Sequence, residues 1–239
     1  MPTKFLDVLP DPNYKMDSAG FEDSAGEAGP GFARVKLSNI SSFDSDKTMT
    51  GIWIPKKTKA PYWSITINYN PMTLAEFSPV YNFIMQKRGR RLPFYISLPQ
   101  YRVPKDSTFA TYVQSNPVTT AESGAAGVTN IQMTTSGWTS YPKFGDLFHI
   151  EDAADTLHTK AYMISHVETS TDYQSGNAPG AGNIRAHFSP PLSRSTTSGS
   201  SVVFNRPLIK VVQQTDLQQY KLDAEGLYSF SLKLEEALY

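Results

Sequence analysis

The sequence contains no cysteine among its 239 residues, and this absence removes several kinds of chemistry. Disulfide bonds, thiol catalysis and metal sites with cysteine ligands are all excluded. Because a secreted protein of this size would often carry disulfide bonds, we expect assembly in the cytosol. Residues 1–10 lack the apolar core of a signal peptide, and no apolar run approaches the length of a membrane span.

Charged residues are also scarce, at 18% of the chain, and they balance to a formal net charge of zero. Without a basic excess, nucleic acid and anionic membranes are not expected as main partners. Weak repulsion between copies leaves self-assembly unopposed. Aromatic residues make up 12% of the chain, which suits β-sheets and protein interfaces.

Recognisable catalytic and cofactor motifs are missing as well. There is no Gly-x-Ser-x-Gly elbow to accompany the four histidines, and the glycine-rich stretch 176–182 precedes a predicted strand instead of a helix, so it is no phosphate loop. Glu235 and Glu236 are adjacent on a predicted strand and face opposite ways. Paired carboxylates of a glycan hydrolase are placed by the fold, so that alternative stays open. We predict no enzyme activity and no cofactor.

One segment gathers enough ionisable side chains to consider a metal site: His149, Glu151, Asp152, Asp155 and His158. Carboxylates and imidazoles together could bind a divalent ion. The spacing matches no zinc signature, however, and a polar hairpin loop explains the same residues. We therefore predict no metal site.

The clearest structural signals lie between residues 62 and 98. Trp63, Ile65 and Ile67 alternate with polar residues, which predicts a half-buried strand over 62–69. Thr73 and Glu76 have the spacing of a capping box, which predicts a helix over 74–88. We predict a second strand over 93–98. The apolar stripe predicted for this helix consists of Leu74, Phe77, Tyr81, Ile84 and Met85.

Two features of this helix need separate interpretation. Pro79 removes an interior hydrogen bond, so we expect a kink there or a late start near Ser78. Gly89 suits the left-handed residue after a helix. The basic run around it, Lys87, Arg88, Arg90 and Arg91, either complements the helix dipole or contacts an acidic partner.

The remaining strands are short and separated by turn-rich stretches, which predicts a mainly β fold. Strand-like runs fall at 32–40, 51–55, 128–133, 147–151, 160–169, 183–188, 201–204, 208–213 and 228–235, with Ile52, Trp53 and Ile54 as a buried run. Residues 113–127 have a linker composition. We predict a sandwich-like or barrel-like β domain with one helix, made of residues 1–112 and 207–239, and an inserted antiparallel β domain at 113–206.

The first 31 residues look irregular, with two Asp-Ser-Ala-Gly repeats followed by Gly29-Pro30-Gly31. Residues 10–31 are either a disordered loop or an arm that orders against a partner subunit, and the composition fits both.

Several phrases resemble the distal tail proteins of tailed bacteriophages. They are Trp63, Pro71-Met72, Gly89-Arg90 and Pro93-Phe94, then Gly145-Asp146-Leu147-Phe148, the run 160–167, 186–192, Gly199 with 202–204, and 226–236. The resemblance covers about 63–236, with a gap over 100–143, and residues 10–31 do not align.

This resemblance implies a virion structural protein that assembles in the host cytoplasm. Such proteins form a homohexameric ring at the tail tip or baseplate by sheet pairing, and the inserted domain projects outward toward fibres, hub proteins or host sugars. The basic run would then lie at the subunit interface, so reversing Arg90 and Arg91 to Glu should block assembly. The tail tube and baseplate proteins are the implied partners.

A carbohydrate-binding module is the alternative function, for the whole chain or for the inserted domain. Exposed aromatic side chains can stack on sugars, although strand and interface positions explain them equally well. Tyr141 and Tyr173 are the candidate glycan contacts. A tail-associated glycan hydrolase is a third hypothesis.

Overall fold

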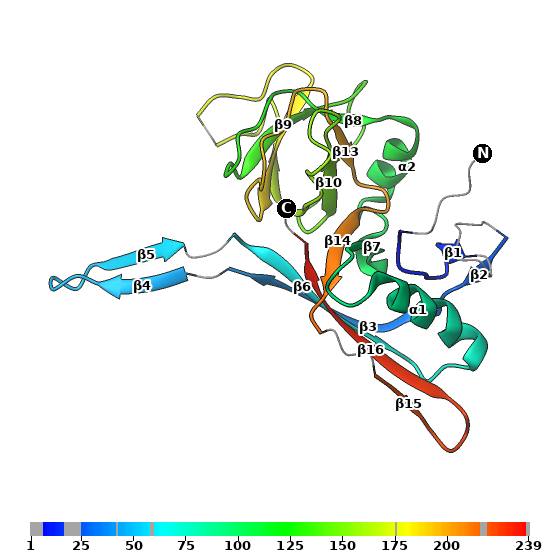
Figure 1. Ribbon diagram of the computed structural model, residues 1–239. Helices are drawn as coiled ribbons and strands as arrows, with labels where there is room; N and C mark the ends of the chain where they lie inside the picture. The colour runs from blue at the N-terminus through cyan, green and yellow to red at the C-terminus, as the bar shows by residue number, and fades with distance from the viewer. Residues whose placement is uncertain are drawn as a thin grey trace.

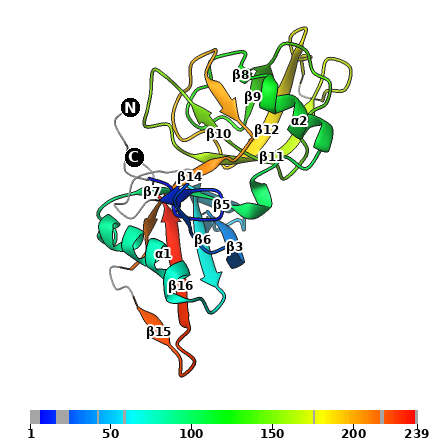
Figure 2. The same cartoon turned by 90° about the vertical axis from the view of Figure 1, so that its right-hand side faces the viewer.

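The computed structural model describes residues 7–16, 25–41, 43–57, 60–174, 176–215 and 219–237, which form two β structures with separate hydrophobic cores. One is a helix-backed antiparallel sheet, and the other is a closed antiparallel barrel above it (Figures 1 and 2). The mainly β fold class is confirmed. The described residues of 7–101 and 207–237 are called the sheet unit, and those of 102–206 the barrel unit.

The main sheet takes its strands from both ends of the chain. Its antiparallel order is β3 (Phe32–Ile40), β6 (Tyr62–Tyr69), β16 (Tyr228–Glu236), β14 (Leu208–Gln213) and β7 (Phe94–Ser97). A further strand, β15 (Tyr220–Leu222), pairs with the N-terminal end of β16. Alternation decides which side chains face the core: Trp63, Ile65 and Ile67 of β6 are buried, as predicted.

Helix α1 (Leu74–Lys87) covers the core face of this sheet (Figure 2). The Glu76 carboxylate accepts hydrogen bonds from the amide and the hydroxyl of Thr73, both at 2.9 Å, so the helix begins where the capping box predicts. Of the two alternatives predicted for Pro79, the late start near Ser78 is wrong, because the helix starts at Leu74 and continues through Pro79. Burial of Phe77 and Val80 on either side of Pro79 stabilises that turn.

The predicted apolar stripe of α1 is only half right. Phe77 and Ile84 are buried, but Leu74 and Met85 are 59% and 52% exposed. The helix instead buries Val80 and Phe83, and Phe83 meets Phe94 edge to face at 5.3 Å. Apolar residues occupy more than one face of this helix, so helical spacing alone does not select the buried one.

The barrel closes six strands in the order β10-β11-β12-β9-β8-β13. Their bounds are β8 (Val118–Thr120), β9 (Asn130–Thr134), β10 (Leu147–Glu151), β11 (Ala161–Glu168), β12 (Asn183–Ser189) and β13 (Ser201–Val203). Large rings fill the interior: Phe148 packs against Tyr162, Phe188 and Phe204 with centroid distances of 5.4–5.6 Å.

The linker predicted over 113–127 is partly wrong. Helix α2 (Ser107–Ser115) follows a one-turn 3-10 helix (Pro99–Tyr101) and runs into the start of this stretch, and β8 within it completes the barrel. The Asp106 carboxylate caps α2 by accepting a 2.8 Å hydrogen bond from the Phe109 amide, and Phe109 is fully buried in the barrel core. Short polar strands such as β8 have the same composition as linkers, so composition alone does not distinguish the two.

The described part of the N-terminal segment packs on its own chain, so the interpretation of residues 10–31 as a disordered loop does not fit it, and ordering against a partner subunit stays a prediction. β1 (Lys15–Met16) pairs with β2 (Glu27–Ala28), and Asp11 is buried with a 2.6 Å ion pair to Arg102. A side chain at Gly29 would meet the Pro10 carbonyl oxygen at 2.3 Å, so this close approach requires glycine. Residues 17–24 lie outside the described residues.

β4 (Phe43–Lys47) and β5 (Trp53–Lys57) form a two-stranded arm that extends from the β3–β6 pair, away from the main sheet and from the barrel (Figure 1). The prediction of a buried run here is wrong, because Ile52, Trp53 and Ile54 are 63%, 58% and 51% exposed. A two-stranded arm with no second layer packed against it in the described part of the chain has no core in which to bury these side chains. Among the described residues, no helix has the length and apolar character needed to span a membrane.

Candidate interaction surfaces

The two edges of the main sheet differ. At the β7 edge, the N-terminal segment adds a short parallel bridge: the Leu9 amide donates to the Tyr95 carbonyl oxygen and the Tyr95 amide to that of Asp7, both at 2.8 Å. At the opposite edge, β3 pairs with β6 on one side only, within the part of the chain that the structure describes. β3 therefore offers nine residues of strand edge to another chain.

The arm adds apolar surface next to this edge. Met49 lies at its tip, fully exposed, and Ile52, Trp53 and Ile54 follow. The Lys47 ammonium lies 5.8 Å from the centre of the Trp53 ring. Exposed apolar groups gathered in one place are typical of protein interaction sites.

The four cationic residues of the basic run differ in whether they contact other parts of the chain. Lys87 is only 8% exposed, and its ammonium pairs with Asp7 at 2.6 Å and lies 4.9 Å from the Phe83 ring centre. The Arg90 guanidinium donates to the Gln214 carbonyl oxygen within the chain. Arg88, which is left-handed at φ 52°, and Arg91 are both exposed. The structure thus links half of the run to the sheet unit itself and presents Arg88 and Arg91 to solvent.

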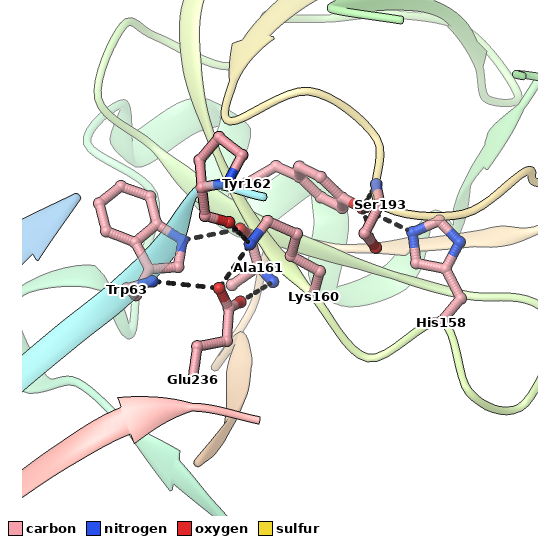
Figure 3. Close-up of polar contacts among 8 residues, drawn as sticks. Trp63, His158, Lys160, Ala161, Tyr162, Ser193 and Glu236 are labelled. Atoms are coloured by element: carbon pink, nitrogen blue, oxygen red, sulfur yellow. Dashed lines mark hydrogen bonds and ion pairs between the residues drawn. The ribbon is translucent and has the colours of Figure 1, made fainter. Parts of the chain in front are cut away.

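A buried ion pair joins the two units where β16 ends beneath the barrel (Figure 3). The Lys160 ammonium lies 2.5 Å from the Glu236 carboxylate and donates to the Pro61 carbonyl oxygen at 2.8 Å. The same carboxylate accepts the Trp63 amide at 3.1 Å and the Ala161 amide at 3.3 Å. The Trp63 indole N–H donates to the Ala161 carbonyl oxygen at 2.8 Å.

This network is almost fully buried, and its ion pair contacts backbone groups from both units. The side chains of Lys160 and Glu236 are 2% and 0% exposed. Burial raises the pKa of the Glu236 carboxyl, and the Lys160 ammonium with the Trp63 and Ala161 amides opposes that rise. On the barrel side, the Tyr162 hydroxyl forms a separate set of hydrogen bonds, with His158 Nε2 at 2.8 Å and with the Ser193 amide, which donates to it at 3.1 Å (Figure 3).

The ionisable residues singled out between 149 and 158 do line one pocket, of 460 Å³, between the barrel and strands β7 and β14. Each of them is held by a local partner. Asp155 pairs with Arg194 at 2.5 Å, and His149 accepts the Leu208 amide at 3.3 Å. The Asp152 carboxylate accepts the amides of Thr197 and Ala154 at 2.8 and 2.9 Å and the Thr197 hydroxyl at 3.0 Å.

These hydrogen bonds set the charge of Asp152. Burial raises the pKa of its carboxyl, but the donors from Thr197 and Ala154 outweigh burial and lower the pKa to about 2. The carboxylate therefore connects the turn that follows β10 with the loop that precedes β13, a structural role that the interpretation as a polar hairpin loop predicts.

The two candidate glycan aromatics lie in different surroundings. Tyr141 is 37% exposed, stands 5.9 Å from the Trp138 ring and lines a groove of 440 Å³ together with Phe144, His166 and Asp172. Tyr173 is 44% exposed and does not line that groove. The structure thus places Tyr141 in a concave surface and Tyr173 outside it.

Sequence reasoning missed one group of possible metal ligands on the barrel. His166, Glu168 and His187 each present a ligand atom within 4.8 Å of the others. Burial, and next to it His166, lower the pKa of the His187 imidazole. The sequence signal was the i, i+2 spacing of His166 and Glu168 on a strand, but the third residue comes from another strand and no spacing reveals it.

Comparison with known proteins gives one family. Residues 9–101 match the family model described as distal tail protein pb9, A domain, N-terminal. The matched range includes residues 10–31, which the resemblance could not align, and it confirms the resemblance to distal tail proteins. A search of curated proteins found no match to the chain.

Proposed function

We propose that the chain is the ring subunit of a phage tail tip or baseplate, because residues 9–101 match the family model of the N-terminal part of a distal tail protein A domain. The ring joins the tail tube to the host-recognition apparatus, and the barrel unit is an inserted domain on its periphery. The observation that carries this proposal is the open β3 edge.

A ring of identical subunits needs two complementary surfaces on each copy. The β3 edge is one of them, since strand pairing satisfies its backbone groups without any special side chain. The arm is the second, because it extends beyond its own sheet and carries exposed apolar residues that its own subunit does not cover (Figure 1). The arm of one copy thus packs beside the β3 edge of the next copy, which closes a hexamer.

Arg88 and Arg91, at the end of α1 and away from the β3 edge, form a separate charged surface for an acidic neighbour in the ring. They are exposed, unlike Lys87. Reversal of Arg90 would also remove its bond to Gln214 inside the chain, so reversal of Arg88 and Arg91 is the cleaner test of the basic run.

The test is native mass spectrometry of the purified full chain, with negative-stain images of the same samples. The wild type should form closed rings, and the double variant Trp53→Ser, Ile54→Ser should be monomeric with an unchanged melting temperature. Leu157→Ser is the matched control, since Leu157 is 47% exposed on the barrel unit and should leave the rings intact. Rings of normal mass from the arm variant, or a wild type that is monomeric at every concentration, would overturn the proposal.

A second candidate function is glycan binding by the barrel unit. The groove beside Tyr141 favours it, because Phe144 is 73% exposed in the same groove and aromatic faces exposed in a concave polar surface suit sugar rings.

Titration of the full chain with host-surface glycans separates the two functions, whether or not rings form. Tyr141→Ala should weaken binding at least tenfold, whereas Tyr173→Ala, outside the groove, should leave it unchanged. Equal losses from both variants would place the sugar elsewhere, and no binding by the wild type would remove this function.

A further inference from the structure

Strands β11 and β12 bring two imidazoles and a carboxylate together on the outer surface of the barrel. His166 and His187 are direct cross-strand partners, and Glu168 follows two residues after His166 on the same face. The two imidazole rings lie 3.8 Å apart with an interplanar angle of 12°. The His187 Nε2 atom lies 3.5 Å from a Glu168 carboxylate oxygen.

A β-bulge creates this cluster. The pairing register shifts between Ile164 and His166, so Ser165 is an extra residue on β11. With regular alternation, His166 and Glu168 would share the inward face of Ile164. After the bulge, Val167 packs toward the core and its two neighbours face outward. A bulge that re-aims side chains in this way is a common feature of functional sites.

We propose that His166, Glu168 and His187 bind a late first-row divalent metal ion such as Zn²⁺. Two imidazoles and one carboxylate are a ligand set that zinc accepts, and they leave a fourth position open. The three ligand atoms already lie within 4.8 Å of one another. In a tetrahedral zinc site they would lie about 3.4 Å apart, so the ligand atoms must approach by about 1.5 Å and one of the stacked rings must rotate until both imidazole lone pairs point at the ion.

The surroundings support the site. His166 is exposed, so its ring can rotate out of the stack, and the open position faces solvent. The Glu168 side chain is only 4% exposed and is held by the Arg185 guanidinium at 2.9 Å and the Gln174 amide at 3.1 Å. Such outer partners orient a ligating carboxylate. The open position would take a water molecule or a donor atom from an adjoining protein.

The test uses the full chain with its affinity tag removed and its metal stripped by a chelator. Co²⁺, whose absorption reports coordination by imidazole, is titrated first, and Zn²⁺ is then added to displace it. The wild type should bind one ion per subunit, and Zn²⁺ should raise its melting temperature. His166→Ala, which changes an exposed side chain, should weaken binding more than tenfold and abolish the thermal shift, and His187→Ala should do the same.

The control is His149→Gln. His149 lies 3.3 Å from Glu151 and forms a second histidine–carboxylate pair on the barrel, which makes it a suitable control for adventitious metal binding. This variant should bind one ion with unchanged affinity. Wild-type affinity in His166→Ala, loss of binding in His149→Gln, or no binding by the wild type would each overturn the proposal.

Discussion

The sheet unit and the barrel unit manage the edges of their β-sheets in opposite ways. In the barrel, β10 pairs with both β11 and β13, so the strands form a closed ring without an open edge. In the sheet, residues 7–9 cover one edge and β3 leaves the other open. This difference favours the sheet unit as the part that would pair with another chain in the proposed ring, since its β3 edge is paired on one side only among the described residues. The closed barrel has no such edge, and its outer surface stays available for other contacts.

The largest effect on stability is expected from a substitution at the junction between the two units. Glu236→Ala leaves the Lys160 ammonium buried without its carboxylate, and we expect the free energy of unfolding to fall by about 3–5 kcal/mol. Glu235→Ala, at the neighbouring and more exposed position, should change it by less than about 0.5 kcal/mol. Chemical denaturation at one protein concentration measures both values. An unchanged stability of Glu236→Ala would mean that the junction does not hold the units together.

The next test asks whether the units unfold separately. Ile65 lies in the sheet core and Ile164 in the barrel core, 0% and 2% exposed, and their clusters do not share residues. Ile65→Ala and Ile164→Ala should each cost about 2–5 kcal/mol, because each leaves a cavity in a packed core.

Hydrogen exchange read by peptide mass spectrometry localises these losses. Faster exchange should appear mainly in β6 and β16 for Ile65→Ala, and mainly in β11 and β12 for Ile164→Ala. Uniform acceleration over the whole chain in both variants would show one cooperative unit and contradict the division into two domains.

The comparison also shows what the sequence can predict. The prediction was correct almost to the residue for the strand 62–69, which alternates strictly, and for the helix start with its capping box. Both features depend on residues that are close together in the sequence. The buried face of α1 was not, since its residues on several faces are apolar and only the sheet below selects among them. The arm was misread for a related reason: Ile52, Trp53 and Ile54 look like a core strand, but whether a layer covers them is decided elsewhere in the chain.

Candidate sites followed the same rule. Residues close in sequence, from His149 to His158, do line one pocket, but local partners hold each of them. His166 and His187, which contact each other, are far apart along the chain. Their contact depends on a β-bulge that residue spacing does not predict. The basic run was read as one surface, whereas Asp7 and Gln214 divide it.

The smallest expected effect is a pH dependence that belongs to the barrel unit. The pKa of Asp152 is about 2 in the folded chain, below the ordinary value of 3.8, so its carboxylate stabilises the fold above pH 3.8 and this contribution is lost as the pH falls toward 2. Asp152→Asn cannot gain a proton in this range. The barrel of the wild type should therefore lose more stability between pH 4 and pH 2 than the barrel of the variant, and both proteins should lose stability equally in the sheet unit. Hydrogen-exchange rates of β10 and β13 peptides, measured in both proteins across this pH range, test the sign of this change in stability. If the stability of β10 depends on pH equally in the two proteins, Asp152 does not couple the barrel to pH.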